Sequence, residues 1–161
     1  MRRANGGKGE LGQVQAIRYA EELPAIDTYY AMFCETGWNE RLRLSKTQLE
    51  LALQGSWYSV CAYDDRDRLV GTGRLVSDGA YECFVCDVMV DPSSQGHGIG
   101  RGIVDRLLAH AKSRGIPWVQ VTVAEGKSGF YGRLGFVPRP DDAPGMDIWF
   151  TAEEYPDAGP H

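Results

Sequence analysis

The fold is decided by residues 88–101, which read Val-Met-Val-Asp-Pro-Ser-Ser-Gln-Gly-His-Gly-Ile-Gly-Arg. An apolar strand runs here into alternate glycines and then directly into an amphipathic helix. Glycines 96, 98 and 100 have no Cβ, so the backbone can take positive φ and an anion can approach its amides. The first amides of a helix are unpaired and carry the positive end of its dipole. The stretch therefore predicts a phosphate-binding turn, although a glycine-rich turn without a ligand has the same pattern.

The glycine spacing argues against two common nucleotide-binding loops. The dinucleotide fingerprint Gly-x-Gly-x-x-Gly needs its last glycine where this chain has Arg101 or Ile103. A nucleoside triphosphate loop needs a glycine five residues before its Gly-Lys-Ser, but Val121 stands at that place before the Gly-Lys-Ser of residues 126–128. A nicotinamide oxidoreductase is disfavoured for the same reason.

The composition is that of an ordinary globular domain. The chain has 161 residues, of which 43% are apolar and 24% charged, and its net charge is −5. We expect one domain over residues 13–151, between a flexible N-terminal tail, 1–12, and a C-terminal tail, 152–161. The negative charge argues against a nucleic-acid partner. No apolar run has the length of a membrane span and no secretion signal is evident, so we expect no membrane partner and a cytoplasmic protein.

The cysteines and histidines do not form a metal-binding pattern. Cys83-x-x-Cys86 has the look of a ligand pair, but an odd separation inside a strand places the two side chains on opposite faces. No second pair follows, and the three histidines lack chelating spacing. We therefore expect no metal site, and reduced, mostly buried thiols.

Hydrophobic periodicity predicts helices and strands in alternation. Helices are expected over residues 24–36, 98–114 and 128–134, and from a capping box at 45–48 to Gly55, with a turn at 36–40. Strands are expected over residues 13–18, 57–63, 69–77, 81–90 and 118–123, with 136–137 and 146–150 as candidates for a closing hairpin. The middle strands should form an antiparallel meander, and residues 81–123 a right-handed parallel crossover. The fold class is therefore α/β (α+β), with a mixed sheet.

A second stretch, residues 129–136, reads Gly-Phe-Tyr-Gly-Arg-Leu-Gly-Phe. It is similar to the Phe-Tyr-x-x-x-Gly-Phe signature of the GNAT N-acetyltransferase superfamily, and Gln95-x-x-Gly98-x-Gly100 resembles the acyl-CoA loop of the same superfamily. The two motifs stand in the family's order, and the resemblance extends over nearly all of residues 14–150. It implies a mostly antiparallel central sheet, flanked by helices and splayed between its fourth and fifth strands, with acetyl-CoA in the opening.

The resemblance also implies how acetyl-CoA is held. The backbones of Val88 and Val90 would bind pantetheine and the acetyl carbonyl, and the amides from Gln95 to Arg101 would bind the pyrophosphate. Arg101 either meets a phosphate or is a solvated surface arginine. The expected cofactor-binding residues are Val88, Met89, Val90, Gln95, Gly96, His97, Gly98, Ile99, Gly100 and Arg101.

The same resemblance assigns catalytic roles. Tyr131 matches the tyrosine that protonates the departing thiolate, and a core tyrosine is the alternative. The backbone N–H of Val88 would polarise the thioester carbonyl. For the general base the strand before the glycine loop offers Glu82 and Asp87, and a water-relayed proton path stays open.

The acceptor pocket is expected from the helical region before Trp57 and from the fourth strand. Candidate substrate-binding residues are Trp38, Tyr30 and Phe84, and an aromatic wall with nearby carboxylates would favour a small amine. We expect an acetyl-CoA-dependent N-acetyltransferase that acts on a primary amine of a small molecule by direct attack on the thioester. A protein or peptide N-acetyltransferase and a non-catalytic acyl-CoA-binding sensor are the alternatives, and a homodimer is possible.

Overall fold

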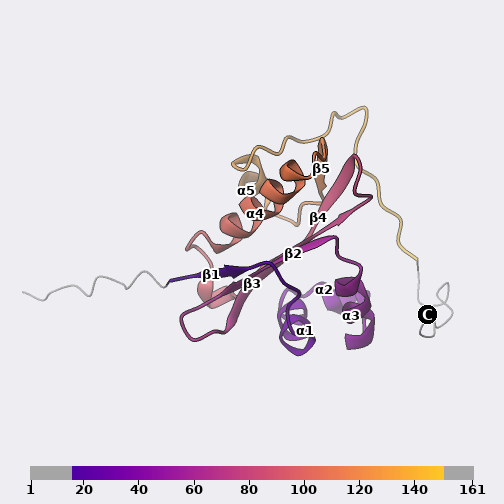
Figure 1. The fold of residues 1–161 in the computed structure, drawn as a ribbon. Coiled ribbons are helices and arrows are strands. Elements are labelled where there is room, and N and C mark those ends of the chain that lie inside the picture. The colour runs from indigo at the N-terminus through magenta and orange to yellow at the C-terminus, as the bar shows by residue number, and fades with distance from the viewer. Residues whose placement is uncertain (1–15, 151–161) are drawn as a thin grey trace, which may run out of the picture. The chain divides into compact units, whose positions relative to one another are not determined.

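A computed structural model describes residues 16–150 of the chain (Figure 1). The chain divides into two compact units, one up to Thr122 and one from Val123 onward. The first unit holds the sheet and four of the helices, and the second holds one short helix. The single domain expected over residues 13–151 stays a prediction.

The first unit is built on a five-stranded sheet in the order β1-β2-β3-β4-β5. The strands are β1 Arg18–Ala20, β2 Tyr58–Tyr63, β3 Leu69–Ser77, β4 Glu82–Val90 and β5 Trp118–Val121. Neighbouring strands are antiparallel except β4 and β5, which are parallel. The expected mixed, mostly antiparallel sheet is confirmed. The first strand was predicted too early, because it begins at Arg18 and residues 13–15 lie outside the described part.

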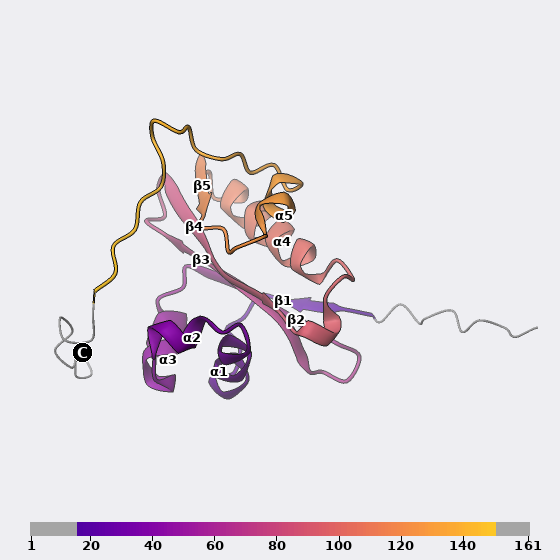
Figure 2. The ribbon, with the colours of Figure 1, turned by 180° about the vertical axis from the view of Figure 1, so that it is seen from behind.

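Helices cover both faces of this sheet (Figures 1 and 2). The three helices α1 Ile26–Glu35, α2 Trp38–Leu42 and α3 Lys46–Gln54 lie on one face, and α4 Ile99–Ser113 lies on the other. The capping box of α3 is confirmed: the Ser45 hydroxyl accepts from the Gln48 amide at 3.2 Å, and the Ser45 amide donates to Gln48 Oε1 at 2.8 Å.

The turn expected at residues 36–40 is wrong in part, because α2 begins at Trp38. Gly37, with φ of 79°, does make the sharp turn that ends α1. The chain then coils again because the Trp38 ring packs edge-on against Phe33, with 5.7 Å between the ring centroids. Tertiary packing therefore overrides the local turn signal here.

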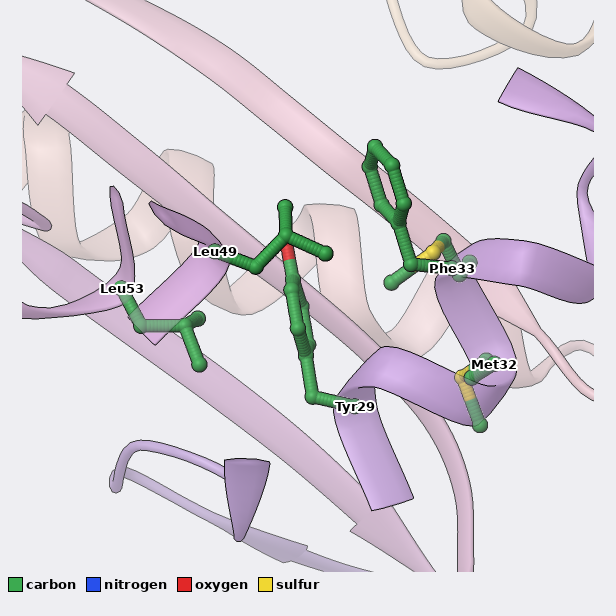
Figure 3. Packing of buried hydrophobic residues seen from close by; sticks show 6 residues of the cluster. Tyr29, Met32, Phe33, Leu49 and Leu53 are labelled. Atoms are coloured by element: carbon green, nitrogen blue, oxygen red, sulfur yellow. The ribbon is translucent and has the colours of Figure 1, made fainter. Parts of the chain in front are cut away.

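The face under α1 and α3 contains a compact apolar cluster (Figure 3). Its buried members are Tyr29, Met32, Phe33, Leu49, Leu53 and Met89. Met89 brings the end of β4 into the cluster, so the helices before the sheet are fastened to the strand that precedes the glycine loop.

The face under α4 depends on glycines in β3. A Cβ on Gly73 would lie 2.8 Å from Ile103 Cγ2, and one on Gly71 would lie 2.9 Å from Ile103 Cδ1. Only glycine permits this approach of helix to strand. Ile103, Val104 and Leu107 are fully buried in consequence. The start of α4 is thus fixed against the centre of the sheet.

The second unit contains α5, Ser128–Gly132, two residues shorter than expected. The closing hairpin predicted from 136–137 and 146–150 is wrong, because residues 136–150 form no strand. Pro138 and Pro140 have no N–H to donate to a ladder. A turn closes there instead, in which the Ala143 amide donates to the Pro140 carbonyl at 2.9 Å. Met146, 93% exposed, and Ile148, 77% exposed, make no buried contact that would hold a strand.

Candidate active site

The loop between β4 and α4 is held in place by its own residues. Asp91 Oδ1 accepts from the Ser93 amide at 2.9 Å and caps a short 3₁₀ turn, Pro92–Ser94. Gln95 Nε2 donates to the Val90 carbonyl at 3.0 Å, and His97 Nδ1 lies 3.3 Å from the Ser94 carbonyl. The conformation of the loop is therefore supported by hydrogen bonds of its own residues.

The backbone amides of this loop point to an anion site. Gly96 and Gly98 have φ of 81° and 80°, the left-handed region that glycine alone enters freely. Within the described residues, the amides from Gly96 to Arg101 donate to no protein acceptor, and the first helical bond runs from Gly102 to Gly98. Gly100 lies inside α4 and supplies a free first-turn amide, not a left-handed turn. Consecutive free donors at a positive helix end suit a phosphate or diphosphate.

The strands beside this loop part as the resemblance implied. β4 and β5 pair from Glu82 opposite Trp118 to Val85 opposite Val121, where β5 ends. β4 continues to Val90 with β3 on its other side. Along residues 86–90 that edge of β4 therefore has no strand partner in the described part of the chain. Backbone groups left open in this way are satisfied by water or by a ligand with amides of its own.

A β-bulge lies at the point where the strands part. Arg74 pairs with Cys86 and Thr72 pairs with Met89, so Asp87 and Val88 together face Gly73. Asp87 has φ of 50°. The extra residue changes which face each following side chain meets. Val88 Cγ2 would be 3.3 Å from a Cβ on Gly73, on the α4 side, whereas Met89 enters the cluster of α1 and α3.

The carboxylate of Asp87 is fixed through one oxygen. Its Oδ2 accepts from the Tyr29 hydroxyl at 2.8 Å and from Arg74 Nε at 2.6 Å, and Arg74 Nη1 donates to the Ala52 carbonyl at 3.1 Å. Burial and the neighbouring Asp87 charge raise the pKa of Tyr29 far above its usual value, so its hydroxyl stays a donor. Burial alone would lower the pKa of Arg74, but Asp87 raises it above the usual value.

The second candidate carboxylate, Glu82, has different surroundings. Its Oε1 accepts from Gln120 Nε2, and it stands at the start of β4, where that strand pairs with β5. The open edge begins four residues later. The structure thus brings Asp87, and not Glu82, to the point where the strands part.

Comparison with known proteins adds to this geometry. The family model described as Acetyltransferase (GNAT) domain matches residues 56–138, which include β4, the glycine loop and α4. This chain belongs to the GNAT acetyltransferase family. Enzymes of this family use acetyl-CoA as co-substrate.

Curated relatives agree with this membership. Serotonin N-acetyltransferase 2, chloroplastic, of Oryza sativa subsp. japonica is 32% identical over 86% of this chain and 70% of its own length. GCN5-related N-acetyltransferase 1, chloroplastic, of Arabidopsis thaliana is 31% identical over 81% of this chain and 65% of its own length. The acetyltransferase described here therefore spans about two thirds of these relatives.

Solved structures agree on the fold. A GNAT-family acetyltransferase from Streptococcus pneumoniae is 28% identical, has a TM-score of 0.70, and covers 85% of this chain and 99% of its own. A probable acetyltransferase from Staphylococcus aureus has a TM-score of 0.73 at 24% identity, covering 84% of this chain and all of its own. The second likeness concerns the fold alone.

The acceptor residues that the sequence predicted for this acetyltransferase lie on different elements. Trp38 and Tyr30 pack against the apolar cluster, and the Tyr30 ring centroid is 5.8 Å from Lys46 Nζ. Phe84 is 40% exposed and is paired in the sheet with Val76 and Gln120. Among residues 16–150, no hydrogen bond, ion pair or ring contact joins Phe84 to Tyr30 or Trp38. Their role in acceptor binding stays a prediction.

Two residues that contact Asp87 were not among the predicted site residues. These two residues are Tyr29 and Arg74. Tyr29 and Tyr30 are neighbours on α1, about 100° apart around the helix, so only one of them can face β4. The signal that could have singled out Arg74 is its charge inside an apolar strand. A charged side chain in such a position is rarely buried unless it has a partner.

Arg101 and Tyr131 complete the predicted set. Arg101 Nε lies 3.5 Å from Asp105 Oδ2, one turn along α4, and both side chains are exposed. Its contact with a phosphate stays a prediction. Tyr131 is buried in the second unit, where its ring meets Phe130 and Phe136 edge-on, with centroids 4.9 Å and 5.6 Å away. Its ring orientation is thus fixed within that unit.

Within the described residues, no group of His, Cys, Asp and Glu side chains is arranged to hold a metal ion. None of the helices of residues 16–150 is both long and apolar enough to cross a membrane.

Proposed function

We propose that this acetyltransferase transfers the acetyl group of acetyl-CoA to a primary amine of a small molecule, by direct attack of the amine on the thioester. One observation carries the proposal: the run of free amides from Gly96 to Arg101 begins a helix directly beside the open edge of β4. The free amides suit the diphosphate of coenzyme A, and the edge at residues 88–90 suits the amides of its pantetheine arm. In this proposal, coenzyme A also contacts the backbones of Met89, Gln95 and His97.

The chemistry requires three groups. The attacking ammonium has a pKa near 10, by analogy with lysine, and must lose a proton before it attacks. The carbonyl oxygen gains negative charge, which the Val88 N–H would stabilise by about 3 kcal/mol. The C–S bond then breaks, and the thiolate takes a proton, which we assign to the Tyr131 hydroxyl.

Asp87 is the better candidate for the base. Both of its hydrogen bonds from Tyr29 and Arg74 go to Oδ2, and among residues 16–150 no donor reaches Oδ1. Its side chain is 21% exposed, which is consistent with access of an amine, or of a water that relays the proton, to Oδ1. A relay through water is consistent with this exposure.

The acceptor class is supported by chemistry and by the relatives' names. Asp87 lies in a partly buried position next to the aromatic cluster of α1, which suits a compact amine with an apolar body. The rice relative is named for serotonin, an arylalkylamine, whereas a Glycine max relative, 30% identical over 78% of this chain, is named histone acetyltransferase TAP1. We therefore keep a protein lysine as the second candidate. The cytoplasmic location and a homodimer also stay predictions.

An amine panel tests the proposal. Full-length protein with acetyl-CoA is supplied with serotonin, tryptamine, aliphatic amines, a free-amino-terminal peptide and a histone-tail lysine peptide, and thiol release is followed. We expect turnover above background with an arylalkylamine or another small amine. Turnover with the peptides alone would replace the small acceptor by a protein. If no acceptor gives thiol release above background, only the acyl-CoA-binding protein remains.

Acetyl-CoA should stabilise the fold. A ligand at 100 times its Kd adds about 2.7 kcal/mol to the free energy of unfolding. For a chain of this size that raises Tm by roughly 5 to 10 °C, measured by calorimetry or dye fluorescence. Pantetheine, which lacks the diphosphate, should give a much smaller shift. Equal shifts from pantetheine and coenzyme A would contradict a diphosphate site at the start of α4.

Gly98→Ala should weaken acetyl-CoA binding about tenfold. An L-residue at φ of 80° costs roughly 1 to 2 kcal/mol, and the loop relieves this strain by a change of backbone conformation that turns its amides away from the phosphate. Gly115→Ala is the matched control. It has φ of 75°, lies past the other end of α4, and like Gly98 has nothing within 4 Å of its missing Cβ. Both variants should lose a similar amount of Tm without ligand. An unchanged Kd in Gly98→Ala, measured by calorimetric titration, would move the phosphate elsewhere.

A further inference from the structure

We propose that Tyr29 and Arg74 are positioning residues for catalysis, which hold the bulge of β4 and leave Oδ1 of Asp87 free for the proton. The inference rests on the proposed acetyl transfer. Neither residue is required to touch acetyl-CoA or the amine. They act through Asp87, and they tie its position to helices α1 and α3.

The backbone of Asp87 has a conformation that is rare inside a strand. Three non-glycine residues of the described chain have positive φ, and Asp87 is the one that lies inside a strand. Such a conformation is strained for an L-residue and persists where the surroundings determine it more than once. The bonds from Tyr29 and Arg74 to Oδ2 are the contacts that determine it here.

The two donors to Asp87 Oδ2 come from elements other than β4. Tyr29 comes from α1, and its buried ring belongs to the same cluster as Leu49 of α3 (Figure 3). Arg74 comes from β3, opposite the bulge, and its Nη1 is anchored on the Ala52 carbonyl of α3. Both donors are therefore held by packing and hydrogen bonds of their own. A donor held in this way fixes its acceptor as well.

The two carboxylate oxygens of Asp87 have different surroundings. Oδ2 takes both protein bonds and Oδ1 takes none from the described residues. Val88 is the next residue, so a rotation at Asp87 would also turn the N–H that we assign to the thioester carbonyl. The hydrogen bonds from Tyr29 and Arg74 thus position two catalytic groups at once, the Asp87 carboxylate as proton acceptor and the Val88 N–H as donor to the carbonyl.

The charged and titratable groups around Asp87 are few. Tyr29 faces it from α1, Arg74 from β3, and Cys86 from the preceding position of β4; α3 contributes the uncharged Ala52 carbonyl. Burial raises the pKa of the Cys86 thiol, which is then neutral near pH 7. Arg74 is the cation of this group. Its removal deletes the charge, whereas Tyr29→Phe deletes one hydrogen bond and keeps the ring.

The experiment compares Tyr29→Phe, Arg74→Met and Arg74→Lys with Tyr81→Phe, a control at an exposed tyrosine in the turn before β4. We expect Tyr29→Phe and Arg74→Met to lower kcat by about tenfold to 10²-fold, with KM for acetyl-CoA within a factor of about two. Arg74→Lys should restore part of the kcat that Arg74→Met loses, because lysine keeps a cation at this position but cannot bridge Asp87 and Ala52.

A readout independent of turnover separates this inference from the proposed function. In ¹⁵N spectra of the folded variants, the Asp87 and Val88 amides should shift and exchange faster in Tyr29→Phe and Arg74→Met, and not in Tyr81→Phe. If those amides and kcat match the wild type and only Tm falls, the two residues are merely structural and the inference is overturned. If the amides shift but wild-type protein acetylates no amine, the bulge is held as proposed and the proposed function fails.

Discussion

Asp87→Asn should lower kcat by about 10²- to 10⁴-fold, the range that a positioned general base contributes. Asparagine has the same shape, and its carbonyl oxygen still accepts from Tyr29 and Arg74, so the bulge and the fold should persist. Its amide nitrogen takes no proton from the attacking amine. Initial rates of thiol release at saturating acetyl-CoA, with the best acceptor of the panel, measure the effect.

Two comparisons sharpen this result. Asp27→Asn changes a carboxylate of α1 that is exposed and paired with Lys46, and it should leave kcat near that of the wild type. Glu82→Gln should lose far less activity than Asp87→Asn, and the opposite order would assign the base to Glu82. With Asp87→Asn, the loss should shrink as pH rises toward about 10, because more of the amine is then already neutral. A near-normal rate in both variants at pH 7 would leave proton removal to water alone.

Tyr131→Phe should lower kcat by about 10²-fold or more while the Kd for acetyl-CoA changes little. Phenylalanine keeps the edge-on contacts with Phe130 and Phe136, so the ring stays in place and only the hydroxyl is lost. Without that hydroxyl the departing thiolate has no assigned proton donor. The measurement combines steady-state turnover with calorimetric titration of acetyl-CoA.

The Tyr131 result has a clear alternative. If Tyr131 is only a core residue of the second unit, the variant keeps its kcat within a factor of about two and changes Tm alone. A parallel loss of Kd and kcat would instead make the hydroxyl a binding group. The exposed Tyr81→Phe variant controls for the loss of a phenol as such.

The sequence predicted the parts of the fold that depend on local patterns. The strand over residues 69–77 was placed at its observed bounds, and the Ser45 capping box and the glycine loop formed as expected. Each of these depends on residues a few positions apart, whose periodicity or turn chemistry is visible in one chain. The parting of β4 from β5 was foreseen through the family resemblance, and not through periodicity.

Features that depend on distant contacts were missed. The bulge at Asp87 leaves the apolar pattern of residues 82–90 looking like an ordinary strand, because it is held by Arg74, 13 residues away, and Tyr29, 58 residues away. The same holds for α2, which forms because Trp38 meets Phe33. Alternating residues at 146–150 suggested a strand, but a strand also needs a partner, which the pattern of one segment does not reveal.

The hydrogen bond from Tyr29 to Asp87 has a consequence for laboratory evolution of this enzyme. Substitutions that reshape the first helix to admit a bulkier amine would also disturb Tyr29, which we propose orients the Asp87 carboxylate. Selectivity and turnover would then change together, and early variants with new acceptors should be slow ones. Recovery would come from second-site changes in β3 or α3 that restore the carboxylate's orientation, at positions that never meet the amine.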